Sequence, residues 1–164
     1  MERLWAPWRL EYITQEKSGG CIFCEKPLAE DDRANYLLLR GDHAFVLLNA
    51  FPYNNGHLMV APYAHLSELD ELPHETLVEM MHLCQEATLA LKLALHPDGF
   101  NVGFNLGAAA GAGIKDHLHL HVVPRWGGDT NFMPVLADVR VVPQSLERSW
   151  QELSEAFRKV REGQ

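Results

Sequence analysis

The sequence lacks any run of about 18 or more apolar residues, the minimum that a membrane-crossing helix needs. Its first residues, MERLWAPWRLEYI, have scattered charges and no apolar core, so we expect neither a secretion signal nor a transit peptide. Internal repeats and low-complexity segments are also missing. These absences predict one ordinary globular domain without membrane contact, spanning residues 1–164.

Positive charge is scarce. Lys and Arg number 14 against 22 Asp and Glu, which gives a formal net charge of −8 at pH 7. A general nucleic-acid binder needs a basic face, so this charge balance argues against nucleic acid as a partner. A small phosphorylated ligand remains compatible, because a local cluster of groups can oppose the overall field.

Cysteine is also rare, with Cys21, Cys24 and Cys84 the only three. An odd count without a secretion signal predicts reduced thiols and a cytoplasmic location. Cys21 and Cys24 form a C-x-x-C pair, which is typical of a redox site or of half a zinc site. No βαβ pattern surrounds the pair, which disfavours the redox reading; two reduced cysteines packing the N-terminal arm remain an alternative.

The hydrophobic pattern predicts an α+β fold, an antiparallel sheet with a long helix and a C-terminal helix packed on it. We expect an N-terminal arm (1–20), a core (21–126) and an extension with a helix (127–164). Strands are expected at 36–39, 43–48, 57–61 and 100–105, and a fifth should carry the histidine run and end at Pro124. Helices are expected at 75–95 and 144–160, the first burying Leu77, Met80, Met81, Cys84, Leu91 and Leu95.

Histidine is concentrated in one place. Of nine histidines, His117, His119 and His121 alternate with apolar residues in DHLHLHVVPRW. Period-two spacing places the three imidazoles on one strand face and the leucines and valine on the other. A polar strand face that happens to hold histidine, or a metal-only site, would also produce this pattern.

The segment before the histidines favours a phosphate ligand. Residues 107–113 read GAAAGAG, and such small side chains leave backbone N–H groups open to phosphate oxygens. Imidazole is a good nucleophile near neutral pH, and its attack on phosphorus would split one displacement into two easier steps. The loop and the histidines together indicate phosphoryl or nucleotidyl transfer.

The motif HLHLHVV resembles the alternating signature of the histidine triad superfamily of nucleotide hydrolases and transferases. The stretches LWAPWRLEYI, GCIFC, LLNAFPYNNGHLMVAPYAH and GAAAGAGIKDHLHLHVVPRWGGDTNFMP resemble its bacterial diadenosine tetraphosphate phosphorylase branch. The resemblance implies a homodimer that converts diadenosine tetraphosphate and inorganic phosphate to ADP and ATP. A hydrolase of nucleotide polyphosphates or phosphoramidates, or a non-catalytic nucleotide-binding protein, are the alternatives. Whether Mg²⁺ accompanies the substrate stays open.

The resemblance also assigns roles. His119 matches the nucleophile, His121 the third triad member near the phosphate oxygens, and His57 a histidine that supports the triad. Asn49 matches a ribose contact, and the phosphate side of the ligand would meet Asn105, Gly111 and Gly113. Arg125 is a further phosphate candidate, although an exposed arginine at a strand end is as good an interpretation.

Zinc-containing members of the superfamily complete the cysteine pair with two histidines. The matching residues here are His65 and His117, so the resemblance implies a structural zinc site formed by Cys21, Cys24, His65 and His117. One departure concerns the acceptor. Hydrolase branches carry Gln-Ser or Gln-Thr just before the triad, whereas this chain has Gly113-Ile114. The absence of those hydrogen-bonding side chains favours phosphate over water as the acceptor.

Overall fold

The computed structural model describes residues 20–129 and 143–163. Most of the expected N-terminal arm, and residues 130–142 of the expected extension, lie outside the described residues. No helix within those two ranges has the length and apolar composition to span a membrane.

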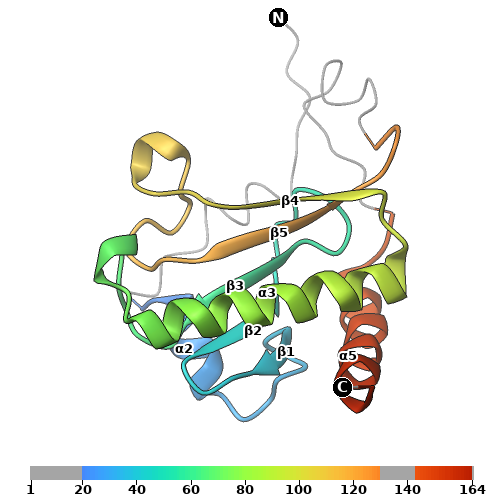
Figure 1. Ribbon diagram of the computed structural model, residues 1–164, viewed down its shortest axis with the longest axis horizontal. Coiled ribbons are helices and arrows are strands. Elements are labelled where there is room, and N and C mark those ends of the chain that lie inside the picture. The colour runs from blue at the N-terminus through green and yellow to red at the C-terminus, as the bar shows by residue number, and fades with distance from the viewer. Residues whose placement is uncertain (1–19, 130–142, 164) are drawn as a thin grey trace, which may run out of the picture.

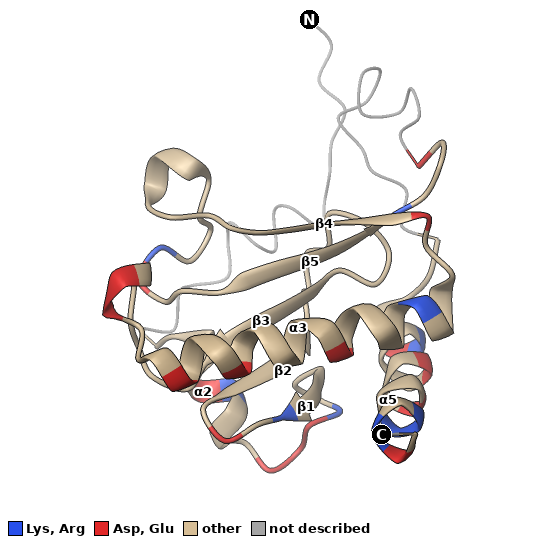
Figure 2. Cartoon of the chain, viewed as in Figure 1, with Lys and Arg blue, Asp and Glu red and all other residues tan. Residues whose placement is uncertain are grey.

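Five strands form one sheet in the order β1-β2-β3-β5-β4, and every neighbouring pair is antiparallel (Figure 1). The strands are β1 (Leu37–Arg40), β2 (Ala44–Leu48), β3 (Leu58–Pro62), β4 (Gly99–Phe104) and β5 (Leu120–Arg125). The predicted α+β architecture is therefore confirmed. Figure 2 shows no charged residue on β2 or β3, as expected for strands that are buried on both faces.

The two faces of the sheet are covered by different helices. Helices α3 (His74–Leu95) and α5 (Leu146–Glu162) pack on one face, and Figure 1 shows α3 crossing in front of the strands. The short helix α2 (Ile22–Leu28) packs on the opposite face. There its Phe23 joins a small cluster, called here the α2-side cluster: Phe23, Leu37, Phe45, Leu47, Met59 and Ala61. Because side chains alternate along a strand, each central strand contributes to both cores.

The long helix is confirmed, but one predicted core residue is wrong. Met80, Cys84 and Leu91 are buried, Leu77 and Leu95 are partly buried, and Met81 is 47% exposed. The residues of α3 that are buried, Met80, Leu83, Cys84, Ala87 and Leu91, follow three- and four-residue spacings, and Met81 falls outside this buried stripe. Leu83 is buried instead of Met81. As predicted, Cys84 is a core residue.

The fifth strand begins later and ends later than expected. His117 and His119 precede β5, because the Leu118 N–H donates to the Leu66 carbonyl (2.7 Å) rather than to β3. Pro124 lies inside β5, opposite Phe100. The Pro124 carbonyl points away from β4, because it accepts from Asn54 Nδ2 (3.1 Å). A backbone N–H at this position would point to the same side, so its absence removes no hydrogen bond between β4 and β5.

Candidate active site and metal centre

The three predicted histidines lie on the sheet face that α2 covers. His121 on β5 pairs with Met59 of β3, which belongs to the α2-side cluster. The Phe23 ring contacts both His117 (centroids 5.2 Å apart) and His119 (4.7 Å). Exposures of 0%, 6% and 8% for His117, His119 and His121 show that the imidazoles are buried rather than lining an open surface.

His117 and three other predicted ligands converge on one point. His117 Nδ1 lies 3.3 Å from Cys21 Sγ and 3.6 Å from Cys24 Sγ. His65 Nδ1 lies 3.3 Å from Cys24 Sγ and 3.2 Å from His117 Nδ1. All four ligand atoms are within 4.8 Å of one another. Tetrahedral zinc with bonds of about 2.0–2.3 Å holds its ligand atoms about 3.3–3.8 Å apart, so this donor set fits zinc.

The His117 ring is oriented by the backbone. Its Nε2 atom lies 2.9 Å from the Pro62 carbonyl oxygen, which can only accept, so the hydrogen of His117 is on Nε2. Nδ1 then presents its lone pair to the two thiols and to His65. A carbonyl that fixes the far nitrogen of a ligand histidine is the usual support of a metal site.

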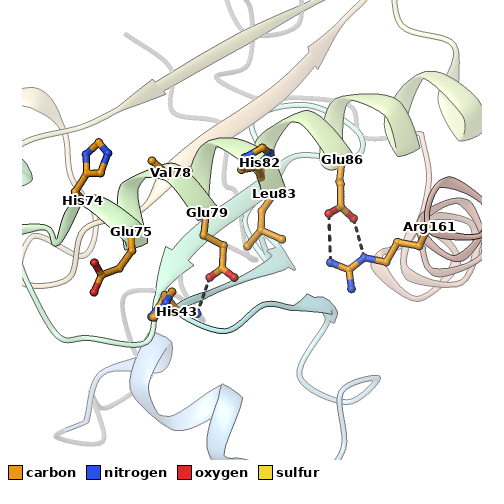
Figure 3. Close-up of a pocket in the computed structure, with 9 residues that line it drawn as sticks. All are labelled: His43, His74, Glu75, Val78, Glu79, His82, Leu83, Glu86 and Arg161. Carbon is orange, nitrogen blue, oxygen red and sulfur yellow. Dashed lines mark hydrogen bonds and ion pairs between the residues drawn. The ribbon is translucent and has the colours of Figure 1, made fainter. Parts of the chain in front are cut away.

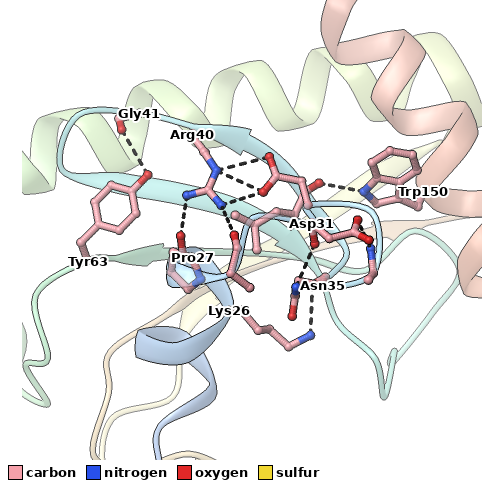
Figure 4. Close-up of polar contacts among 12 residues, drawn as sticks. Lys26, Pro27, Asp31, Asn35, Arg40, Gly41, Tyr63 and Trp150 are labelled. Carbon is pink, nitrogen blue, oxygen red and sulfur yellow. Dashed lines mark hydrogen bonds and ion pairs between the residues drawn. The ribbon is translucent and has the colours of Figure 1, made fainter.

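Helix α2 holds the cysteine pair in place. Cys21 directly precedes the helix and Cys24 follows one turn later, so both thiols point to the same side. The end of α2 is tied to β1 by Arg40, which donates to the Pro27 carbonyl (2.8 Å) and to Asp32 Oδ1 (2.6 Å) (Figure 4). This contact fixes the helix against the sheet edge, and with it the two thiols.

His119 has its hydrogen on Nδ1, whereas His117 has its hydrogen on Nε2. Its Nδ1 atom lies 2.9 Å from the His117 carbonyl oxygen and must donate to it. The lone pair of a neutral ring is then on Nε2. Burial lowers the pKa of His119, which favours this neutral form. A neutral imidazole with a free Nε2 lone pair is a competent nucleophile.

A fourth histidine joins the triad. His57 Nε2 lies 2.9 Å from His121 Nδ1, and His57 Nδ1 accepts from the Tyr53 backbone N–H (3.0 Å). The Asn49 amide lies beside the same atom (Nδ2–Nδ1 3.3 Å). Asn105 approaches the other end of the group, with Nδ2 3.4 Å from His121 Nε2. The structure thus brings His57, Asn49 and Asn105 to the triad, while the ribose contact of Asn49 and the phosphate contact of Asn105 stay predictions.

The imidazoles of His57 and His121 are both held in the neutral form. Burial, followed by the neighbouring rings of His121 and His119, lowers the pKa of His57 to about 3. Burial and then His119 lower the pKa of His121 to about 4. Both rings therefore carry no charge near neutral pH.

The small-residue loop lies just before the histidines. It contains one short 3-10 turn, η2 (Ala108–Ala110), between Gly107 and Gly111, whose φ angles are +75° and +82°. A Cβ atom built at either glycine would meet nothing within 4 Å, so the backbone there is open to an approaching group. Gly111 and Gly113 are both exposed. Ile114 instead packs against the α2-side cluster.

A sequence profile of the HIT domain matches residues 32–128, which include His57 and the whole histidine run. The chain belongs to the HIT domain family. It is similar to a protein of Mycobacterium tuberculosis named AP-4-A phosphorylase, with 41% identity over 155 residues that cover 89% of this chain and 79% of the relative.

Two further HIT proteins bear on the site. A structure described as a Zn-bound histidine triad family protein from Mycobacterium smegmatis superposes with a TM-score of 0.72 at 30% identity, covering 90% of this chain and 99% of that one. Adenosine 5′-monophosphoramidase HNT1 of Saccharomyces cerevisiae is 29% identical over 107 residues, covering 65% of this chain and 63% of that protein. The family thus includes members named for different reactions.

Two residues of this HIT domain that were predicted to contact the ligand, Arg125 and Asn49, have hydrogen-bond partners within the chain. Arg125 forms an ion pair with Asp129 (Nε–Oδ2 2.6 Å) and donates to Asn101 Oδ1 (2.7 Å). It also lies four residues beyond His121, about 13 Å along an extended strand. Its phosphate contact stays a prediction that this ion pair argues against. Asn49 likewise accepts from the Phe51 N–H (2.9 Å), so a ribose would compete with contacts inside its loop.

Sequence reasoning missed two side chains of the site. Phe23, the second residue between the paired cysteines, is fully buried against His117 and His119. Tyr53 makes a tilted ring contact with His57 (centroids 4.6 Å apart) and stacks on His121 (5.5 Å). Aromatic residues next to a C-x-x-C pair and inside the FPYNNG turn were the available signals.

A hollow of about 580 Å³ elsewhere on the HIT domain is not this site. It lies between α3, the turn before β2 and the end of α5 (Figure 3). Two of its three glutamates are engaged: Glu79 accepts from the Ala44 N–H (2.8 Å), and Glu86 pairs with Arg161 (2.8 Å). These contacts tie α3 to the sheet and to α5, so the hollow has a structural explanation.

Proposed function

We propose that this protein is a nucleotidyltransferase that converts diadenosine tetraphosphate and inorganic phosphate to ADP and ATP. The observation that carries the proposal is the bond from His119 Nδ1 to the His117 carbonyl (2.9 Å), which leaves the Nε2 lone pair free. The similarity to a relative named AP-4-A phosphorylase supports the choice of substrate. HIT relatives named AP-4-A phosphorylase and monophosphoramidase support an enzyme that acts on nucleotides.

In the first step, His119 Nε2 attacks the α-phosphorus. A P–N bond forms, the P–O bond to the ATP portion breaks, and its electron pair leaves on ATP. The imidazole becomes cationic. The His117 carbonyl oxygen accepts from its Nδ1–H and stabilises this positive charge. His121 donates from Nε2 to a non-bridging oxygen, where negative charge accumulates in the transition state.

In the second step, a phosphate oxygen attacks the same phosphorus. The P–N bond breaks, its electron pair returns to His119 Nε2, and ADP leaves. The enzyme is restored without net proton transfer to the protein. The open backbone around Gly107 and Gly111 would receive the distal phosphates or the incoming acceptor.

Zinc would be held by Cys21, Cys24, His65 and His117. With four protein ligands it supplies structural support and no open coordination position. The chain's own contribution is to place the His117 carbonyl, which accepts from His119, at a fixed position.

Two observations bear on whether phosphate or water is the acceptor in the second step. Ile114 packs its side chain into the α2-side cluster and offers no hydrogen bond to a water nucleophile, which supports phosphate. The similarity to adenosine 5′-monophosphoramidase supports water instead. Both acceptors share the intermediate on His119.

Incubation with diadenosine tetraphosphate, with and without inorganic phosphate, tests the proposal. ADP and ATP that appear only with phosphate would support a phosphorylase. AMP and ATP without phosphate would replace it with a hydrolase. Tight nucleotide binding without any turnover would favour a non-catalytic binding protein, and wild-type turnover lost in His119→Ala would oppose that alternative. A homodimer and a cytoplasmic location stay predictions.

A further inference from the structure

Tyr53 occupies a position to which the proposed chemistry assigns no role. It lies in the turn between β2 and β3, and its ring stacks on His121 (centroids 5.5 Å apart) and makes a tilted contact with the His57 ring (4.6 Å). Tyr53 is 44% exposed, whereas His57 is 0% and His121 8% exposed. The tyrosine therefore separates this imidazole pair from water on one side.

The backbone of Tyr53 fixes the hydrogens of the pair. Its N–H can only donate, so His57 Nδ1 must accept and the hydrogen of His57 is on Nε2. That Nε2–H donates to His121 Nδ1 (2.9 Å), which in turn places the hydrogen of neutral His121 on Nε2. A protonated His121 would bring its Nδ1–H against the His57 Nε2–H, and the arrangement opposes that state.

The turn that carries Tyr53 is anchored from two sides. Asn54 Nδ2 donates to the Pro124 carbonyl (3.1 Å) and to Asp129 Oδ2 (2.8 Å). Asn55 Nδ2 donates to Gln144 Oε1 (3.1 Å). The two residues after Tyr53 are thereby tied to the end of β5 and to the start of the α5 region. These bonds fix the position of the turn, and with it the distance of the Tyr53 ring from the imidazoles.

We infer that Tyr53 is a positioning residue that keeps His121 neutral with its hydrogen on Nε2, as a fixed donor to a non-bridging phosphate oxygen. The backbone N–H sets the tautomers, and the ring excludes water that would stabilise a charged imidazole. The inference deepens the proposed function and rests on it for the identity of the ligand. Asn49 and Asn105, the other polar neighbours of the pair among the described residues, carry no charge, and His119 is the remaining titratable neighbour there. A hydrogen on His121 Nε2 requires the Asn105 amide to turn its Oδ1 toward that atom, because Nδ2, which lies 3.4 Å away, can only donate.

The first test is a histidine NMR titration of the full-length, zinc-loaded chain, which needs no substrate. In the wild type, ¹⁵N shifts should report Nε2–H tautomers for both His57 and His121. In Tyr53→Ala the pKa of His121 should rise from about 4 toward its ordinary value of about 6.5. Tyr53→Phe keeps the ring and should titrate as the wild type does. An Nδ1–H tautomer of His121, or an unchanged titration in Tyr53→Ala, would overturn the inference.

The second test is the pH profile of turnover of diadenosine tetraphosphate. If the pKa of His121 reaches about 6.5, only about a tenth of it is neutral at pH 5.5, so kcat of Tyr53→Ala should fall about tenfold there. Near pH 8 kcat should stay within about threefold of the wild type. A uniform loss at all pH values would point to disturbed folding and contradict the inference, and Tyr53→Leu repeats the test with an apolar side chain. If the wild type shows no turnover, the proposed function fails, while the NMR result still decides the role of Tyr53.

Discussion

Acid stability gives a quantitative prediction about His57. The side chain is fully buried, and its pKa of about 3 lies below the ordinary value of 6.5. The unfolded chain therefore binds this proton more tightly, and stability is lost as the pH falls from 6.5 toward 3. At about 1.4 kcal/mol per pH unit, the whole interval corresponds to about 5 kcal/mol for this one histidine.

The testable part lies between pH 6.5 and pH 5, above the range in which carboxylates titrate. There a histidine with these two pKa values loses about 1.6 kcal/mol of folding free energy. His57→Gln removes the titration and keeps an N–H that can donate to His121. Urea denaturation should show that the variant loses about 1.6 kcal/mol less than the wild type over this interval.

The comparison is internally controlled. The other histidines and the metal ligands are the same in both proteins, and their contributions cancel in the difference as long as the glutamine donates to His121 as His57 does. His82→Gln, at an exposed position on α3, is the matched control and should keep the wild-type slope. If His57→Gln and the wild type lose stability equally between pH 6.5 and pH 5, the reasoning about the buried imidazole pair is refuted.

Three further substitutions, two of them paired with a control substitution, test the metal site, the packing and the hydrogen bonds of Glu79. Cys24→Ser removes one ligand, so zinc measured by atomic absorption should fall well below one ion per chain; full occupancy would contradict the site. Leu91→Ala should lower the free energy of unfolding by about 2–5 kcal/mol, because Leu91 is fully buried. Leu93→Ala, at a 48% exposed position, should lower it by no more than about 0.5 kcal/mol. Equal losses in the two variants would contradict the packing. Glu79→Gln weakens acceptance from backbone N–H groups and should cost about 1–3 kcal/mol in urea denaturation, with exposed Glu75→Gln as the neutral comparison.

The order of the elements could be predicted because their signals are local. Short apolar runs bounded by turn residues marked β2 and β3, and the 3.6-residue period marked α3 and α5. The start of β5 could not be predicted, because Leu118 bonds to Leu66 rather than to β3. That choice depends on where β3 ends, at Pro62, a residue 56 positions away in the sequence. The exposure of Met81 likewise depended on which side of α3 meets the sheet.

The histidines and cysteines of the site could be predicted from the sequence, whereas Phe23, Tyr53 and the positions of the imidazole hydrogens could not. Period-two spacing put His119 and His121 on one face, and resemblance to the superfamily added His57, His65 and the cysteines. The direction of each imidazole depends on a backbone group from another segment: Pro62 for His117 and Tyr53 for His57. Partners so distant in sequence leave no local pattern, so only the folded structure shows which nitrogen holds the lone pair.

The most direct test of the proposed chemistry is to look for the covalent intermediate. The protein would be mixed with diadenosine tetraphosphate without inorganic phosphate, quenched under alkaline conditions that preserve phosphohistidine bonds, and mapped by peptide mass spectrometry. We predict an adenylyl group on His119 that disappears on addition of phosphate as ADP is released. Turnover with no adduct on His119, or an adduct on another residue, would contradict the account.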